Sequence, residues 1–526
     1  MENLGSIVIP LGSVGYQTDL PEQARGLTHY MKADNVIFEP GLTIRKFGGA
    51  TKLNSTVVTG APNIQGMFDF WFGGGASAFT QKFIAVDSNG RVYKEDMDGV
   101  FDDIAGVATI TANAIPIFAT AGNLLIIAFS TRDTILKWNG TDATVSTLTG
   151  APLGKGCIYH AGRLWIWDGS TLYYSGYGNV EDWTSTDSGK MVIDDGDGDE
   201  IVGAAIYKES LIIFKGPNNG SIHPIYGRSP ASFERGNSIS GIPIQSHNAI
   251  VRIGDDIAFM SPRGVHLLSA VQQYGNYAEM DITRFLKRHF RDYISRSNLT
   301  AGWAVNYVEK SCLLWATTKS GGSENNQMFG LSYARLQEDG WKPFTVTRDC
   351  FSMALRKHPS TRVDELVTGG TDGFIRRQDL AGRNIDDTPY TMNLTTPRML
   401  YATTDAAGVP KGDQPGVLED CYLRSESVGA YSLTAMVRRD NHKPENYLFN
   451  LGSNTGTAIL PFTLPAVLGG TKMEVGYSNP PLIGECRAVQ FTLIQSGLDQ
   501  DAKLIELGFK YKPISQSGVT ATLTAE

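Results

Sequence analysis

The sequence predicts an all-β protein: a β-propeller of about seven blades with an N-terminal arm and a C-terminal β-sandwich-like domain. One observation behind this prediction is a unit made of a short apolar run, a turn rich in Gly, Asp, Asn or Ser, and a second apolar run. The unit recurs seven times, with starts 40 to 55 residues apart, close to the length of one four-stranded blade with its loops. The other is composition, because 58 glycines in 526 residues and 10% aromatic residues suit tight turns between aromatic-rich strands.

The seven repeated units are expected to be β-hairpins. They begin at Phe83, Leu124, Leu164, Leu211, Ile257, Cys312 and Glu365. Further β-like runs precede the hairpins and are predicted to be inner strands, for example 115–119, 156–160, 201–207, 249–253 and 303–307. A lone hairpin is marginally stable, whereas neighbouring blades bury both faces of each sheet around a central axis. The repeat therefore implies a closed ring, and a β-sandwich with similarly spaced hairpins is the alternative.

The repeat also divides the chain. Residues 1–60 lack it and are predicted to be a separate N-terminal arm or cap, while residues 61–385 hold the propeller. Strand-like runs separated by polar loops at 386–512 predict a smaller C-terminal β domain. The segment 513–526 is rich in Ser, Thr, Gly and Ala and is expected to be a flexible tail unless a partner holds it.

One segment, 282–294, has the spacing of an amphipathic helix, with Asp281 placed to cap it. Its polar face carries four cations: Arg284, Lys287, Arg288 and Arg291. Such a face can meet DNA phosphates or an acidic partner subunit. A charged row opposite an apolar stripe is also the ordinary pattern of a solvated helix face, and both interpretations stay open.

Charge, cysteine content and hydropathy exclude several classes of protein. The chain has 46 Lys and Arg against 54 Asp and Glu, a net charge of -8, which argues against a broad nucleic-acid-binding surface. The five cysteines are scattered without CxxC spacing, so neither a disulfide framework nor a zinc site is predicted. No signal peptide is recognisable, and the longest strongly apolar run, 124–129, is too short for a membrane helix, so we expect no membrane insertion.

The common catalytic motifs are absent: nucleophile elbow, Walker A, HExxH and strand-linked GxGxxG. We therefore predict no enzyme activity, no catalytic residues and no cofactor. An alternative is a carbohydrate-binding or polysaccharide-cleaving propeller. It rests on a group of aromatic residues: Trp165, Trp167, Tyr173, Tyr174 and Tyr177. Alternation along a strand explains these residues more simply as packing between blades, which is the favoured interpretation.

The densest acidic segment comprises Asp194, Asp195, Asp197, Asp199 and Glu200. Alternating carboxylates on a loop suit calcium, which makes Asp195, Asp197 and Asp199 candidate metal ligands. Their spacing differs from that of an EF-hand, so a solvated acidic turn is the favoured interpretation. A third interpretation needs no metal: the loop faces the lumen of a passage and repels polyanions.

Several motifs follow one another in an order that resembles the tail nozzle proteins of short-tailed bacteriophages, also called tail tubular protein B or tail accessory factor. They are NVIFEPGLTIRKFGGATKL from Asn35, DGDGDEIVGAAIYKESLIIFKGPNNGSIHPIYG from Asp195, DDIAFMSPRGVHLLS from Asp255, the amphipathic segment, WKPFT from Trp341 and GGTDGFI from Gly369. The resemblance spans roughly residues 25–385, and beyond 385 it rests on domain layout.

This resemblance implies a structural role in a virion tail. Six copies would form a ring below the portal and its adaptor, retain packaged DNA, enclose the channel for genome ejection and carry tail fibres or spikes outside. DNA would be a transient, non-specific partner, and assembly would take place in the host cytoplasm. Six copies at -8 sum to -48, and an acidic conduit lets DNA slide without capture. No segment can be identified as the gate.

Overall fold

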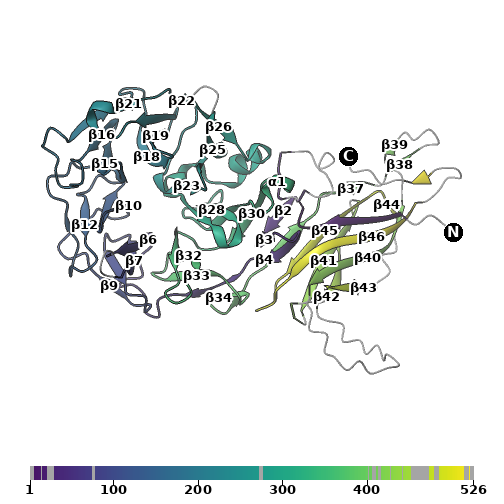
Figure 1. The fold of residues 1–526 in the computed structure, drawn as a ribbon. Coiled ribbons are helices and arrows are strands. Elements are labelled where there is room, and N and C mark those ends of the chain that lie inside the picture. The colour runs from purple at the N-terminus through teal and green to yellow at the C-terminus, as the bar shows by residue number, and fades with distance from the viewer. Residues whose placement is uncertain are drawn as a thin grey trace.

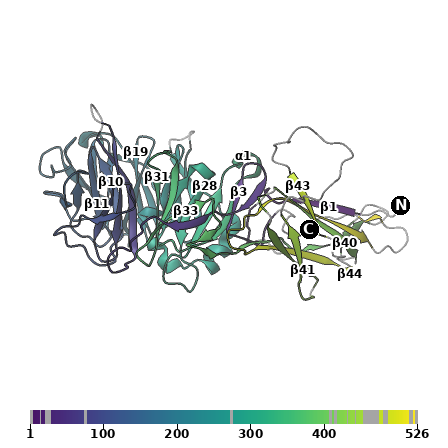
Figure 2. The same ribbon diagram turned by 90° about the horizontal axis from the view of Figure 1, so that it is seen from below.

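Seven small blades of mostly antiparallel strands form a ring, and beside it two layers of strands pack face to face; one of these layers continues the sheet of the sixth blade (Figure 1). Seen from below, the molecule is elongated, with the ring and the packed sheets next to each other (Figure 2). The computed structural model describes residues 5–13, 15–19, 29–73, 78–271, 276–400, 402–404, 410–412, 416–426, 428–429, 431–440, 442–451, 473–478, 485–513 and 520–521. Strands dominate these residues, which confirms the all-β prediction.

The first five blades are each continuous in sequence. Blade 1 contains β6 (Ile64–Phe72), β7 (Thr80–Asp87), β8 (Val92–Glu95) and β9 (Phe101–Asp103), and blade 2 contains β10 (Pro116–Ala121), β11 (Leu124–Phe129), β12 (Leu136–Trp138) and β13 (Ser146–Thr147). Blade 3 contains β14 (Gly156–His160), β15 (Arg163–Asp168), β16 (Thr171–Tyr174) and β17 (Gly189–Val192). Blade 4 contains β18 (Glu200–Tyr207), β19 (Ser210–Gly216), β20 (Ser221–Tyr226), β21 (Glu234–Arg235) and β22 (Ile239–Ser240), and blade 5 contains β23 (Ile250–Ile253), β24 (Asp256–Ser261), β25 (Gly264–Val271) and β26 (Asn276–Asp281).

In the last two blades the sheet continues into strands from elsewhere in the chain. Blade 6 contains β27 (Trp303–Tyr307), β28 (Cys312–Thr317), β29 (Gln327–Ser332) and β30 (Lys342–Thr347). Blade 7 contains β31 (Ser352–Lys357), β32 (Asp364–Gly369) and β33 (Ile375–Leu380), and the N-terminal strand β5 (Gly49–Lys52) is its fourth strand. Two short strands, β34 (Asn384–Ile385) and β35 (Thr388–Pro389), extend blade 7 beyond β5. The first strands β31 and β6 contact each other, so the ring closes between blades 7 and 1.

Each predicted hairpin is the second and third strand of one blade, from β7–β8 in blade 1 to β32–β33 in blade 7. The predicted inner strands 156–160 and 303–307 coincide with β14 and β27. Inner strands from several blades also line one cavity at the centre of the ring. The β-propeller prediction is therefore confirmed, with seven blades in the described chain.

The core of the ring is a series of apolar layers, each between two neighbouring blades. The layer between blades 1 and 2, for example, joins Phe70 and Ile84 to Leu125 and Phe129. Second strands are the most buried because both of their faces meet a neighbouring sheet; β28 is buried along its whole length. This explains why second strands read as nearly continuous apolar runs in the sequence.

The two packed sheets form the β-sandwich. One contains β1 (Gly5–Pro10), β3 (Val36–Glu39), β4 (Thr43–Lys46), β40 (Gly416–Glu426), β43 (Met473–Ser478), β44 (Glu485–Cys486) and β46 (Lys503–Pro513). The other contains β2 (Lys32–Asp34), β36 (Met392–Thr395), β37 (Met399–Leu400), β41 (Ser432–Arg439), β42 (Glu445–Asn450) and β45 (Ala488–Gln495). Alternate residues of β45 are buried, and Phe491 packs on Phe509 of the facing sheet with ring centroids 5.5 Å apart. A small separate sheet joins β38 (Ala402–Thr404), β39 (Pro410–Gly412) and β47 (Thr520–Ala521).

Blade 6 and the sandwich share one sheet. Strand β2 pairs in parallel with β30 of blade 6 and antiparallel with β36 of the sandwich. The result is a ten-stranded sheet running from β27 to β42. Backbone hydrogen bonds therefore cross the boundary between the two domains, so the boundary is part of a sheet instead of a flexible linker.

Buried charges reinforce this boundary. The Asp501 carboxylate binds Arg45 and Arg383 at 2.7 and 2.9 Å. Beside it, the Lys46 ammonium is fully buried and donates to Gln495 Oε1 at 2.8 Å. Burial lowers the pKa of Lys46 to about 8. Arg348 lies over the ring of Tyr390, 3.9 Å from its centroid.

The predicted division at residue 60 is not a division in the fold. Strand β5 completes blade 7, whereas β1, β3 and β4 belong to the sandwich and β2 joins the two domains. The physical reason is that the edge strands of blade 7 and of the sandwich need partners, and the N-terminal strands supply them.

Most of the predicted tail, 513–526, lies outside the described residues; β47 within it pairs with β38.

The predicted helix is two short helical segments, η4 (Arg284–Leu286) and η5 (His289–Tyr293), and elsewhere α1 spans Leu336–Asp339. Asp281 caps the backbone N–H of Thr283 at 2.9 Å. Phe285 and Tyr293, expected on the buried stripe, are 46% and 48% exposed because the backbone is not regularly α-helical.

In the part of the chain that the structure describes, no helix has the length and apolar character needed to cross a membrane.

Candidate functional site

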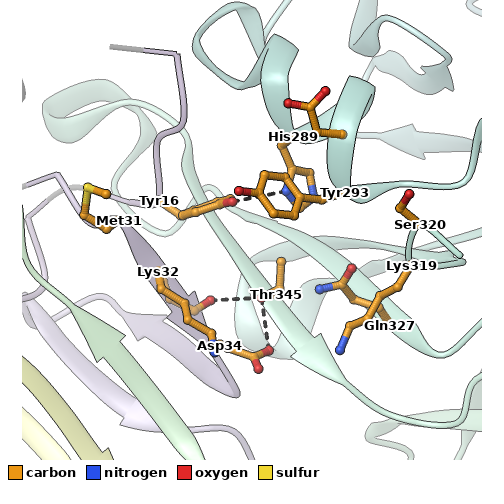
Figure 3. A pocket seen from close by; sticks show the side chains of 12 residues that line it. Tyr16, Met31, Lys32, Asp34, His289, Tyr293, Lys319, Ser320, Gln327 and Thr345 are labelled. Atoms are coloured by element: carbon orange, nitrogen blue, oxygen red, sulfur yellow. Dashed lines mark hydrogen bonds between the residues drawn. The ribbon is translucent and has the colours of Figure 1, made fainter. Parts of the chain in front are cut away.

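A cavity of about 510 Å³ lies where the ring meets the sandwich (Figure 3). Its walls come from the segment before β2, from β2, from η5, from the loop after β28, and from β29 and β30. The lining residues are Tyr16, Met31, Lys32, Ala33, Asp34, His289, Asp292, Tyr293, Lys319, Ser320, Gln327 and Thr345. The parallel pairing of β2 with β30 brings these distant segments together.

Hydroxyl groups connect the charged side chains of this cavity. Asp34 Oδ1 accepts hydrogen bonds from Thr345 at 3.0 Å and Thr347 at 3.2 Å. The Lys319 ammonium donates to the same Thr347 oxygen at 2.8 Å. Within the described residues neither Asp34 nor Lys319 makes a direct ion pair, and their side-chain hydrogen bonds are to hydroxyl groups.

The opposite wall is aromatic. Tyr16, His289 and Tyr293 lie together across the cavity from Asp34 and Gln327 (Figure 3). His289 stacks on Tyr293 with ring centroids 5.8 Å apart, and its Nδ1 is 3.3 Å from the Tyr16 hydroxyl. Burial lowers the pKa of His289 to about 4, so this ring is neutral at neutral pH.

The acidic loop, by contrast, is fixed by separate partners. The Asp199 carboxylate accepts the backbone N–H groups of Asn218, Asn219 and Gly220 at 2.7 to 2.9 Å. Asp197 pairs at 2.8 Å with the buried Lys215. These two carboxylates therefore anchor the turn at the entrance of blade 4.

The remaining acidic residues of this loop do not share a partner. Asp194 pairs with Arg235 at 2.7 Å, and the Arg235 hydrogen bond lowers the pKa of Asp194. Glu200 pairs with Lys155, and Asp195 is exposed. Within the described ranges no three His, Cys, Asp or Glu side chains are arranged to hold a metal ion. The structure thus does not assemble Asp195, Asp197 and Asp199 into a cation site.

The predicted basic helix face is exposed along its length, and most of its charges are paired. Lys287 pairs with Asp281, and Arg288 and Arg291 reach Asp292 at 3.3 and 2.7 Å. The Arg284 guanidinium lies over its neighbour Phe285, 4.6 Å from the ring centroid. These contacts reduce the net positive charge that the face presents.

The aromatic residues of blade 3 mainly pack against other buried side chains. Trp165 and Trp167 are 1% and 0% exposed. Trp165 contacts Tyr174 and Phe233, with ring centroids 5.2 and 5.0 Å apart. Tyr177 is 70% exposed. The tryptophans therefore form part of the apolar layers between blades, not a surface platform.

The centre of the ring is largely apolar. A cavity of about 390 Å³ lies there, and Phe68 and Phe118 stack within it with ring centroids 5.3 Å apart and planes at 17°. Other inner-strand residues on its wall include Ile250, Ala304 and Leu355. An apolar centre of this size is not suited to a polyanion.

Sequence reasoning did not identify the cavity of Figure 3. Its Asp34, Lys319 and Gln327 are isolated polar residues in three separate segments, without motif spacing. Tyr293 was expected on the apolar stripe of the predicted helix, and His289, in the same segment, was not singled out. The cavity depends on the pairing of β2 with β30, for which the sequence carries no short-range signal.

Comparison with known proteins shows a likeness in structure only. No family model and no curated protein matches the chain. Among the solved structures that match is the β-propeller domain of Cps50 (Swd1) from Myceliophteria thermophila, with 9% identity and a TM-score of 0.38. The match covers 63% of this chain and 100% of that domain.

Proposed function

We propose that this protein is a structural, non-catalytic subunit of the tail nozzle of a short-tailed bacteriophage. In this proposal six copies form a ring in the virion tail, below the adaptor and portal. The ring retains packaged DNA and forms the conduit for its ejection, and its outer surfaces hold tail fibres or spikes. The ordered motifs between residues 25 and 385 suggest the family.

The observation that carries the proposal is the sheet shared by blade 6 and the sandwich. The β30–β2–β36 pairing and the buried cluster around Asp501 join two domains into one stiff body. A subunit of a pressurised ring must transmit force without hinge motion. A boundary made of backbone hydrogen bonds and buried ion pairs meets that need better than a loop would.

The DNA conduit of the proposal lies between copies, not along the propeller axis. The propeller centre holds the stacked Phe68 and Phe118 and is largely apolar. A net charge of -8 on each subunit gives a hexamer -48, which disfavours DNA capture on the conduit wall. In this arrangement the loop from Asp194 to Glu200 faces the lumen, and the basic helix face contacts an acidic neighbouring subunit.

Electron microscopy of the purified full chain tests this proposal. We expect rings with sixfold symmetry, and light scattering should give six times the chain mass of 57.1 kDa. Antibody labelling of the corresponding particles should place the protein at the distal end of the tail. A protein that stays monomeric at every concentration and is absent from particles would contradict the proposal.

A further inference from the structure

The cavity of Figure 3 contains buried polar atoms that lack partners. Gln327 Oε1 and His289 Nε2 have no hydrogen-bond partner among the described residues, although the two residues are only 6% and 2% exposed. Native proteins usually satisfy such atoms, and a buried group without a partner is destabilising. An unpaired acceptor and a ring nitrogen in the wall of one cavity therefore point to a ligand with both donor and acceptor groups.

The charges of the cavity limit the class of ligand. Lys32, Lys319, Asp34 and Asp292 line the cavity, Asp292 pairs with Arg288 and Arg291, and His289 is neutral at neutral pH. A cation in the cavity therefore meets the two lysines and a free phosphate meets Asp34. A neutral ligand with hydroxyl groups can donate to the Asp34 carboxylate and accept from the ammonium groups. Asp34 and Lys319 are already connected through the Thr347 hydroxyl, which shows that hydroxyl groups suit both side chains.

The volume of the cavity and its aromatic wall limit the class of ligand further. A volume of about 510 Å³ falls within the range of roughly 300–1,000 Å³ usual for small-molecule sites. Tyr293 is 48% exposed, so its ring offers an apolar surface at the cavity. An amphipathic ligand can place C–H groups on such a ring and turn its hydroxyls toward Asp34, Lys319 and Gln327.

We propose that this cavity binds a neutral saccharide, a hexose or N-acetylhexosamine unit. The hydroxyls bind Asp34, Lys319 and Gln327, and the sugar ring packs on Tyr293. No bond is made or broken in this step. The inference goes beyond the nozzle proposal and does not rest on it, because a monomer could bind a sugar equally well.

Saturation-transfer NMR on the full chain tests the inference with the methyl glycosides of glucose, galactose and N-acetylglucosamine as probes. We expect saturation transfer to at least one of them. Gln327→Leu should weaken its binding by roughly tenfold or more, because it removes the unpaired amide. No transfer to any probe, or equal binding by Gln327→Leu, would overturn the inference.

Tyr293→Ala is a second variant for the case in which Gln327→Leu does not fold, since Tyr293 is half exposed. It should also lose most of the binding while keeping the wild-type melting curve. Tyr177→Ala is the matched control, because Tyr177 is an exposed tyrosine on blade 3, outside this cavity, and its loss should leave sugar binding unchanged. Loss of binding in Tyr177→Ala, or displacement of the bound glycoside by glycine or inorganic phosphate, would count against the inference.

Discussion

Blade 1 begins at Ile64 and ends at Asp103, whereas in the sandwich Gly5 lies opposite Tyr511. The two regions bury the same kinds of apolar side chain, but one is built from contacts between sequence neighbours and the other from contacts between the two ends of the chain. Local contacts leave a repeated pattern in the sequence, and distant contacts do not. Blade 7 and the shared sheet stand between these cases, because each combines a local hairpin with an N-terminal strand.

The largest effect is expected from removing β5, the N-terminal strand that completes blade 7. A fragment of residues 49–389 keeps the four strands of blade 7, while a fragment of 61–389 loses β5. We expect the longer fragment to melt cooperatively, and the shorter one to lose stability on the scale of a whole domain, about 5–15 kcal/mol. Circular dichroism during heating measures the difference.

The same fragments test which region drives assembly. The blades of a closed ring leave few free sheet edges, so the 49–389 fragment should be monomeric by light scattering. Assembly of this fragment into the full oligomer would show that the propeller alone suffices, contrary to our expectation.

The next effect concerns ring closure. Arg356 in blade 7 binds both carboxylate oxygens of Glu95 in blade 1 at 3.0 Å, and both side chains are buried. Arg356→Met leaves a buried carboxylate without its partner, and we expect a loss of about 3–5 kcal/mol in urea unfolding. The exposed pair Arg228–Glu209 is the control, and Arg228→Met should not change stability measurably. Equal effects of the two variants would mean that the buried pair does not hold the ring closed.

A slightly smaller effect is expected at the boundary with the sandwich. Asp501→Asn leaves Arg383 without its carboxylate partner and Arg45 with only Glu39, 3.7 Å away, and should cost about 3 kcal/mol. Burial alone would raise the pKa of Asp501, but hydrogen bonds from Arg383 and Arg45 outweigh it and lower the pKa. The ionised carboxylate therefore stabilises the fold above its ordinary pKa, and this stability is lost as the pH falls through the lowered value. Urea unfolding at pH 7 and in acid, with and without the substitution, measures both effects.

The smallest effect, when counted per pH unit, is a pH dependence shared by both regions. Burial lowers the pKa of His247, in the ring, and of His289, at the boundary, to about 4. Each imidazole must stay neutral in the folded protein, so the free energy of unfolding has its full value above about pH 6.5. Between pH 6.5 and pH 4, each histidine lowers it by up to about 1.4 kcal/mol for every pH unit. Replacing either residue by Gln should reduce the slope of stability against pH. An unchanged slope would show that these histidines are not buried as neutral groups.

The ring was predictable because each hairpin carries its own signal. The run from Leu124 to Phe129 reads as a buried strand from its apolar residues alone, and its partner strand follows within a few residues. The seven-blade count followed from spacing. The role of Gly49–Lys52 did not, because four residues without alternation carry no sign of the distant β33 with which they pair.

The site was less predictable than the fold. The acidic loop was found from composition, but its chemistry depends on Lys215 and on the backbone of Asn218 to Gly220, which only the fold brings near. Gln327 had no distinguishing neighbour in the sequence. What makes it notable is a buried oxygen without a partner, and burial of that kind is a property of the folded chain.

The strand Gly49–Lys52 has a consequence for synthesis on the ribosome. Its partner, β33, starts at Ile375, more than 300 residues later. At about 5–20 residues per second, β5 stays without this partner for roughly 15 to 65 s while blades 1 to 6 are being made. The nascent protein therefore passes through a long interval as an open arc with an unpaired strand at its beginning, and this interval is when a chaperone would act.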